Sequence, residues 1–158
     1  KLEEAVTTYC LNAAEKIRGD NQVCKRLTVF IRTSPFNKNK KFYSNAITID
    51  LPIATSNSIE MVKKARSALK KIYKPGFFYQ KAGIILDSET SEFNLFSPVI
   101  EKKSKKLMKA IDYTNMKYGR HAIRIANAGI SKRWKMRREH SSGIDTASFT
   151  YLPKVSAS

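Results

Sequence analysis

The stretch CKRLTVFIRTSPF, Cys24 to Phe36, is the part of the sequence that decides the fold. With the two-residue period of a β-strand, Leu27, Val29 and Ile31 fall on one face. The opposite face then carries Arg26, Thr28, Phe30 and Arg32. The proline of the closing TSPF removes a backbone donor and restricts the residue before it, so the strand ends there. The pattern predicts a strand with an apolar face on a core and a cationic face, which suits either bulk water or a phosphate backbone.

Charge is the most informative property of the composition. The 158 residues carry 30 Lys and Arg against 13 Asp and Glu, a formal net charge of +17. Such an excess attracts polyanions, with nucleic acid as the first candidate and an anionic membrane surface as the second. The chain has no apolar run of about 18 residues that would span a bilayer and no signal peptide, and it starts without a methionine, which suggests a fragment. Cys10 and Cys24 lie in apolar patterns without a CxxC, which predicts buried thiols in a reducing cytosol and no metal site.

The apolar periodicity predicts an α+β domain. The expected elements are a helix over 1–18, the central strand, a second strand over 42–51 closed by Pro52, a helix over 58–74 and a third strand over 77–86. The expected helix stripes are Leu2, Val6, Tyr9, Cys10, Ala13 and Ile17 in the first helix, and Ile59, Val62, Ala65, Leu69 and Ile72 in the second. A single sheet with both helices on one face would bury these stripes. The bare face would carry Arg26, Thr28, Phe30, Arg32, Tyr79 and Lys81, with Phe78, Ala82, Ile84 and Leu86 facing the core.

The remainder of the chain predicts a linker and a small basic α/β unit. Residues 87–99 are acidic and rich in turn residues around an apolar island, FNLF, which either packs back on the domain or docks in a partner's groove. A helix is expected over 101–118, with Leu107, Ala110, Ile111 and Thr114 on one side, followed by a strand over 121–127. Residues 131–138 are a strand or a helical turn, and residues 146–155 are weakly strand-like. The predicted domains are 1–87, a linker over 88–100, and a basic C-terminal region over 101–158.

The sequence lacks the motifs of the common catalytic and nucleotide-binding sites. It has no paired carboxylates, no GxxxxGK[ST], no GxGxxG and no GxSxG. The chain is therefore interpreted as a binding part, not an enzyme.

Several blocks carry a resemblance to a known family. They are AAEKIRGDNQVCKRLTVFIRTSPF (13–36), FYSNA (42–46), YQKAGIIL (79–86), FNLF (93–96) and RWKMRR (133–138). The chain resembles the C-terminal part of UmuC-type proteins, the catalytic subunits of DNA polymerase V among the Y-family translesion polymerases of the bacterial SOS response. The resemblance implies that residues 1–87 are most of a little finger domain. That domain has the order β-α-β-β-α-β and lays the open face of a four-stranded sheet against duplex DNA. Its first strand would precede Lys1.

The resemblance, together with the cationic face, gives the candidate sites. The residues expected to contact DNA phosphates are Arg26, Thr28, Arg32, Ser34, Lys38, Lys40, Lys41 and Lys81. The segment Glu92, Phe93, Asn94, Leu95 and Phe96 is similar to the pentapeptide that docks bacterial polymerases on the sliding clamp, with Glu92 in place of the usual Gln and Phe93 in place of Leu. The C-terminal region resembles the part of the family implicated in contacts with the UmuD′ dimer and the RecA filament, a likeness that fades after Arg138.

The resemblance also bears on chemistry and location. The parent would be a cytoplasmic DNA polymerase that uses Mg²⁺, with its catalytic carboxylates in a palm domain outside this sequence. The chain itself would need no cofactor and would grip primer-template DNA without sequence specificity. An alternative is an adaptor that recruits the clamp, UmuD′ or RecA and binds little DNA. A free-standing RNA-binding domain is a weaker alternative, because the open face lacks the aromatic-rich signature of an RNA recognition motif.

Overall fold

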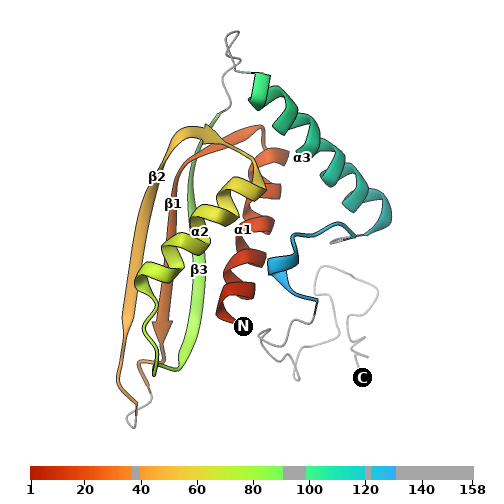
Figure 1. Cartoon of the computed structure of the whole chain (residues 1–158). Coiled ribbons are helices and arrows are strands. Elements are labelled where there is room, and N and C mark those ends of the chain that lie inside the picture. The colour runs from red at the N-terminus through yellow and green to blue at the C-terminus, as the bar shows by residue number, and fades with distance from the viewer. Residues whose placement is uncertain (37–39, 91–98, 120–121, 131–158) are drawn as a thin grey trace, which may run out of the picture.

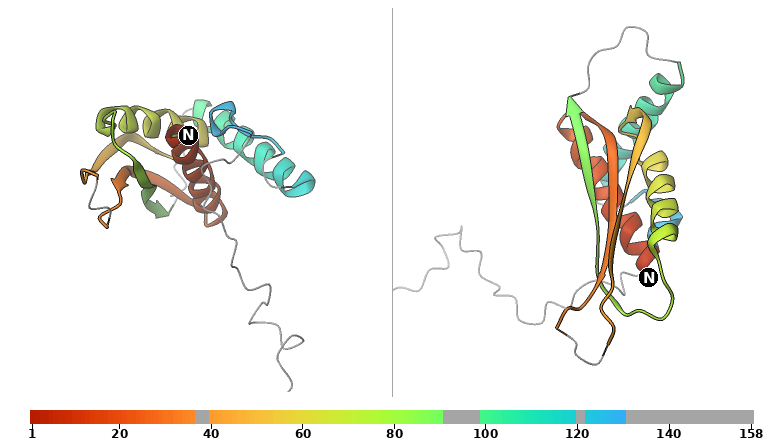
Figure 2. Two further views of the ribbon diagram at one scale, coloured as in Figure 1. Left: turned by 90° about the horizontal axis from the view of Figure 1, so that it is seen from below. Right: turned by 90° about the vertical axis from the view of Figure 1, so that its left-hand side faces the viewer.

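The computed structural model describes residues 1–36, 40–90, 99–119 and 122–130. Its elements are α1 (Leu2–Gly19), β1 (Gln22–Thr33), β2 (Ser44–Thr55), α2 (Ser58–Ile72), β3 (Tyr79–Thr90), α3 (Val99–Tyr118) and a short 3-10 helix η1 (Ala126–Ala128) (Figure 1). The strands form an antiparallel three-stranded sheet in the order β2-β1-β3. Both α1 and α2 lie on one face of it (Figure 2). The predicted α+β class and the order α-β-β-α-β are confirmed.

The central strand has the two faces that its sequence predicts. Leu27, Val29 and Ile31 are fully buried beneath the helices. They pack in one core with the α1 residues Val6 and Cys10 and with residues of α2. Because β1 pairs with a strand on each side, its apolar face has no route to solvent, and the two-residue period is a reliable guide there.

The two cysteines are free and buried, as predicted. Burial and, to a smaller extent, the nearby Cys24 thiol together raise the pKa of Cys10 to about 12. Burial likewise raises the pKa of Cys24 to about 11, although a backbone hydrogen bond at Arg26 acts in the opposite direction. Both thiols are therefore protonated at neutral pH, as suits groups enclosed in an apolar core.

The helix stripes were wrong at two positions. Tyr9 and Ile59 are 39% and 47% exposed, not buried. Tyr9 lies at the margin of the α1 stripe, whose buried residues are Val6, Cys10, Ala14 and Ile17. Ile59, in the first turn of α2, lines the space between α1 and α3, and Met61 takes the core position instead.

The ends of the outer strands also differ from prediction. Pro52 does not close β2, which continues to Thr55. The register shifts there, from the pair Arg26–Asp50 to the pair Cys24–Thr55, so Pro52 lies in an irregular stretch of an edge strand where no ladder donor is needed. On the other side, β3 continues past Leu86 to Thr90, so residues 87–90, predicted as the start of a linker, are strand.

A further irregularity reverses the predicted places of Phe78 and Tyr79. Arg32 pairs with Lys81, but the next residue of β1, Thr33, pairs with Tyr79, so Gln80 is an extra residue in β3. This bulge turns Tyr79 to the helix side of the sheet, where it is half-buried against the core, and not to the open face. Phe78, predicted to face the core, is 69% exposed.

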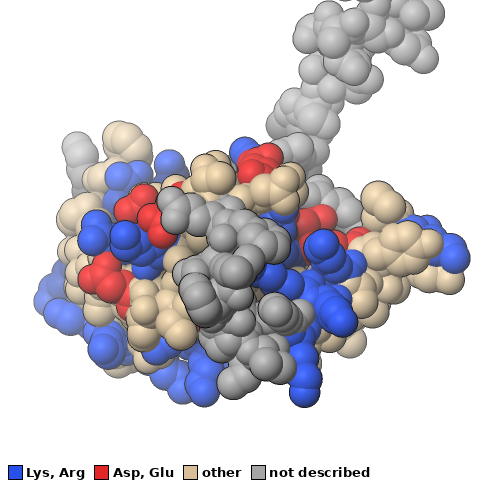
Figure 3. Space-filling view, turned by 90° about the horizontal axis from the view of Figure 1, so that it is seen from above, with Lys and Arg blue, Asp and Glu red and all other residues tan. Residues whose placement is uncertain are grey.

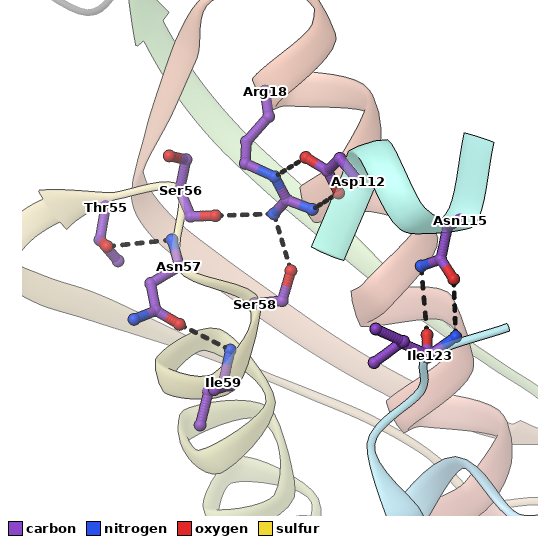
Figure 4. A network of polar contacts seen from close by, with 9 residues as sticks. All are labelled: Arg18, Thr55, Ser56, Asn57, Ser58, Ile59, Asp112, Asn115 and Ile123. Atoms are coloured by element: carbon purple, nitrogen blue, oxygen red, sulfur yellow. Dashed lines mark hydrogen bonds and ion pairs between the residues drawn. The ribbon is translucent and has the colours of Figure 1, made fainter. Parts of the chain in front are cut away.

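The helix predicted over 101–118 is confirmed as α3, but among its side chains that the structure describes Met108 is the buried one and Leu107 is 48% exposed. The strand predicted over 121–127 is wrong, since the described residues 122–130 contain η1 and no strand. The backbone of Ile123 hydrogen-bonds to a side chain and not to a neighbouring strand. The Asn115 side chain accepts from the Ile123 N–H at 2.8 Å and donates to the Ile123 carbonyl at 3.1 Å (Figure 4). The predictions for residues 92–96, 131–138 and 146–155 lie outside the described residues.

A polar network joins α3 to the rest of the fold (Figure 4). The Arg18 guanidinium, near the end of α1, makes two 2.7 Å bonds to the Asp112 carboxylate on α3. It also donates to the Ser56 carbonyl and to the Ser58 hydroxyl at the start of α2. Only 12% of the Arg18 side chain is exposed, so this contact ties three helices together in a partly dry environment.

Candidate nucleic-acid interface

The open face of the sheet, away from α1 and α2, holds the candidate site. In its middle, the hydroxyls of Thr28 and Thr48 share a 2.8 Å hydrogen bond across β1 and β2. On the other side of β1, the Phe30 ring lies over Gly83, so closely that a Cβ there would come within 2.4 Å of the ring. The absence of a side chain at Gly83 thus lets an aromatic ring lie flat on the face.

One end of this face is internally neutralised. Arg26 donates to the Asp50 carboxylate at 2.7 Å and lies 4.0 Å from Asp87, and both acidic groups raise the pKa of its guanidinium. Beside it, Lys25 pairs with Glu89 at 3.6 Å. Figure 3, a view from above, shows Asp and Glu side chains among the Lys and Arg on this side of the molecule. Arg26 is therefore an exposed cation whose field is largely cancelled by its own neighbours.

The opposite end of the face carries uncompensated positive charge. Arg32 and Lys81 are cross-strand partners on β1 and β3. Lys40 and Lys41 are exposed just before β2. None of the salt bridges between described residues involves any of these four side chains. Arg32, Lys40, Lys41 and Lys81 are called the cationic end below, and it lies at the lower tip of the sheet in Figure 1.

The remaining predicted contacts fall in different places. The Ser34 hydroxyl, next to the cationic end, accepts from the Phe36 N–H at 3.3 Å. Thr28 lies in the middle of the face, and Arg26 lies at the neutralised end. Lys38 and the clamp-like segment 92–96 lie outside the described residues. Whether any of these side chains contacts DNA stays a prediction.

Sequence reasoning missed the exposed aromatic side chains beside the cationic end. Phe36, Phe42 and Phe78 are 90%, 57% and 69% exposed. The signal was present for Phe78, because two consecutive phenylalanines directly after a Pro-Gly turn cannot both face one core. A second feature that was missed is the neutralisation of Arg26. The hairpin register that places Asp50 opposite Arg26 was the signal for it.

Comparison with known proteins places this α+β unit among the C-terminal domains of one protein family. Residues 1–93 match the impB/mucB/samB family C-terminal domain, and residues 105–155 match a domain of unknown function, DUF4113. The chain is 34% identical to protein UmuC of Salmonella typhimurium, over 98% of this chain and 38% of that protein. It is 36% identical to protein ImpB of Salmonella typhimurium, over 96% of this chain and 37% of the relative. It is 33% identical to protein MucB of Escherichia coli, with the same coverage of both chains.

The chain belongs to the impB/mucB/samB family and corresponds to the C-terminal part of a UmuC-type protein, which confirms the resemblance in the sequence. It spans less than two fifths of the length of these relatives. None of the described helices is long and apolar enough to cross a membrane.

Proposed function

We propose that this chain is the DNA-binding part of an error-prone translesion DNA polymerase that acts in DNA damage tolerance. It grips primer-template DNA by the phosphate backbone, with the open face of the sheet turned to the duplex. The observation that carries the proposal is the cationic end, where Arg32, Lys41 and Lys81 are free of ion pairs with other described residues. Family membership and a net charge of +17 support it.

The physical character of the face suits a template of any sequence. Arginine and lysine contacts to phosphates fix the position of a protein on a duplex but carry no sequence information. The exposed Thr28 and Thr48 hydroxyls add hydrogen-bonding capacity to the same oxygens. An enzyme that must copy damaged templates gains from a grip that ignores base identity. The catalytic carboxylates and their Mg²⁺ belong, on this proposal, to a part of the parent outside these 158 residues.

A second candidate function is partner recruitment. It is supported by the likeness of residues 92–96 to a clamp-docking pentapeptide. The partners would be the sliding clamp, the UmuD′ dimer and the RecA filament. Replacing Leu95 and Phe96 by Ala separates the two functions, because it abolishes clamp binding and leaves DNA binding intact.

The test of the first function is fluorescence anisotropy of the chain on labelled primer-template DNA, titrated with salt. If about five phosphates are neutralised, log K falls with log salt at a slope of roughly −4 to −5. Two unrelated DNA sequences should give the same slope and affinity. Absence of binding at moderate salt, or a strong sequence preference, overturns the proposal and leaves recruitment as the main function.

A further inference from the structure

Beside the cationic end, the turn that leads into β3 presents Phe78 to solvent with a cation on it. The Lys40 ammonium lies 3.4 Å from the centroid of the Phe78 ring. Phe78 as a whole residue is nevertheless 69% exposed, so most of its surface remains open to solvent. Aromatic side chains are costly to leave in water. One that lies next to lysines without an ion pair to any described residue, at the tip of a sheet, is a candidate contact for a ligand that is both flat and anionic.

The turn that carries Phe78 is held in place from beneath. The Tyr79 hydroxyl accepts from the Lys74 N–H and donates to the Lys74 carbonyl, both at 2.9 Å. The Tyr43 hydroxyl donates to the Ile72 carbonyl at 2.7 Å, and its ring centroid lies 4.9 Å from that of Phe77. This packed aromatic layer fixes both ends of the turn, so Phe78 points outward from a preorganised support.

The surroundings of Phe78 are hollowed and basic. A surface depression of about 250 Å³ is lined by Phe78, Lys40, Lys41, Ser34 and Gln80, among others. Every side chain of this group except the ring can donate a hydrogen bond. Phe36 and Phe42 lie in the segments on either side of the same hairpin tip and are also exposed.

We propose that this tip binds unpaired nucleotides of single-stranded DNA, with a base stacked on Phe78 and its phosphates held by Lys40 and Lys41. The inference deepens the proposed function, on which it rests, by naming the single-stranded template segment next to the duplex as a second ligand. The faces of paired bases are covered by their neighbours in a duplex, whereas an unpaired base offers its face to an aromatic ring. Stacking accepts every base, which agrees with a grip that ignores sequence.

The test compares the variants Phe78→Leu and Phe78→Ala with the unaltered chain on a labelled oligo-dT strand and on a blunt duplex of equal length. Loss of one stacked base weakens binding to the single strand by about tenfold and leaves duplex binding within about twofold. A 2-aminopurine placed in the strand reports stacking directly, because its fluorescence is quenched by the unaltered chain and not by Phe78→Leu. Tyr118→Leu is the matched control, since Tyr118 is also an exposed ring with a lysine above it, at the far end of α3.

The outcomes separate this inference from the proposed function. If the unaltered chain binds duplex but not oligo-dT, the inference fails and the proposed function stands. Equal losses on both ligands, or none on either, also overturn it, as does concentration-dependent self-association that Phe78→Leu removes. If the unaltered chain binds neither ligand, both proposals fail. Thermal melts of the variants should match the unaltered chain, because the replaced ring is exposed.

Discussion

The contrast between the two ends of the open face yields the sharpest prediction about DNA binding. Neutralising the cationic end with Arg32→Gln and Lys81→Gln should weaken binding strongly. Neutralising the other end with Arg26→Gln should weaken it far less. The reason is that Arg26 already has Asp50 at 2.7 Å and Asp87 at 4.0 Å, so a phosphate must compete with two carboxylates for it.

The magnitude follows from counterion release. Each phosphate neutralised contributes about −0.9 to the slope of log K against log salt. Loss of two contacts should therefore make the slope shallower by about 1.8. If the variant and the unaltered chain bind equally at 1 M salt, the variant should then bind about 60-fold more weakly at 0.1 M salt. Arg26→Gln should change the slope by well under half of the change that the loss of one such contact causes. Asp50→Asn, with the opposite change in charge, should tighten binding by freeing Arg26.

The assay is a salt titration of each variant by fluorescence anisotropy on two unrelated primer-template sequences. The cationic-end losses should be the same on both sequences, because phosphates carry no sequence information. The reasoning is refuted if Arg26→Gln flattens the salt slope as much as Arg32→Gln does. It is equally refuted if the double variant keeps the slope of the unaltered chain.

Three further predictions concern stability. Asp112→Ala removes the carboxylate that binds Arg18 and should cost about 2 kcal/mol, between the values for exposed and buried pairs, with faster hydrogen exchange in α3. Asn57→Ala removes the side chain that accepts from the first N–H groups of α2 and should cost about 1 kcal/mol in urea denaturation. Above pH 9.0 an unfolded Cys10 ionises while the native thiol keeps its proton up to about pH 12, so this thiol's contribution to stability is present below pH 9.0 and falls by about 1.4 kcal/mol per pH unit above it. Cys10→Ala should remove the Cys10 part of the slope and leave the part that Cys24 contributes between pH 9.0 and about pH 11, and an unchanged slope would contradict the burial of the Cys10 thiol.

The central strand could be predicted from sequence because strands flank it on both sides and only one of its faces is covered. Strands pair with β1 on both sides, and helices cover one face, so the alternation of Leu27, Val29 and Ile31 had one consistent solution. The helix predicted over 58–74 was equally clear and is present as α2, which ends at Ile72 and has Asn57 as the cap at its start. These elements are fixed by local pattern and capping chemistry.

The errors lie where the direction of burial depends on a partner that the local pattern does not specify. Ile59 and Leu107 are apolar and sit at helical spacing, yet Met61 and Met108 are buried instead. Which side of α3 is buried depends on the Arg18–Asp112 contact, which joins residues 94 positions apart. Periodicity defines a stripe on a helix but does not say which edge of that stripe another helix will cover.

The character of the candidate site depends on one extra residue in β3. Without the bulge at Gln80, strict alternation would place Tyr79 and Lys81 together on the open face and turn Phe78 inward, as the sequence pattern predicts. With it, Tyr79 joins the aromatic layer under the turn, while Lys81 stays on the open face opposite Arg32. Phe78 is left in solvent beside Lys40. A single irregularity in register thus separates the aromatic side chain that supports the tip from the one that the tip presents.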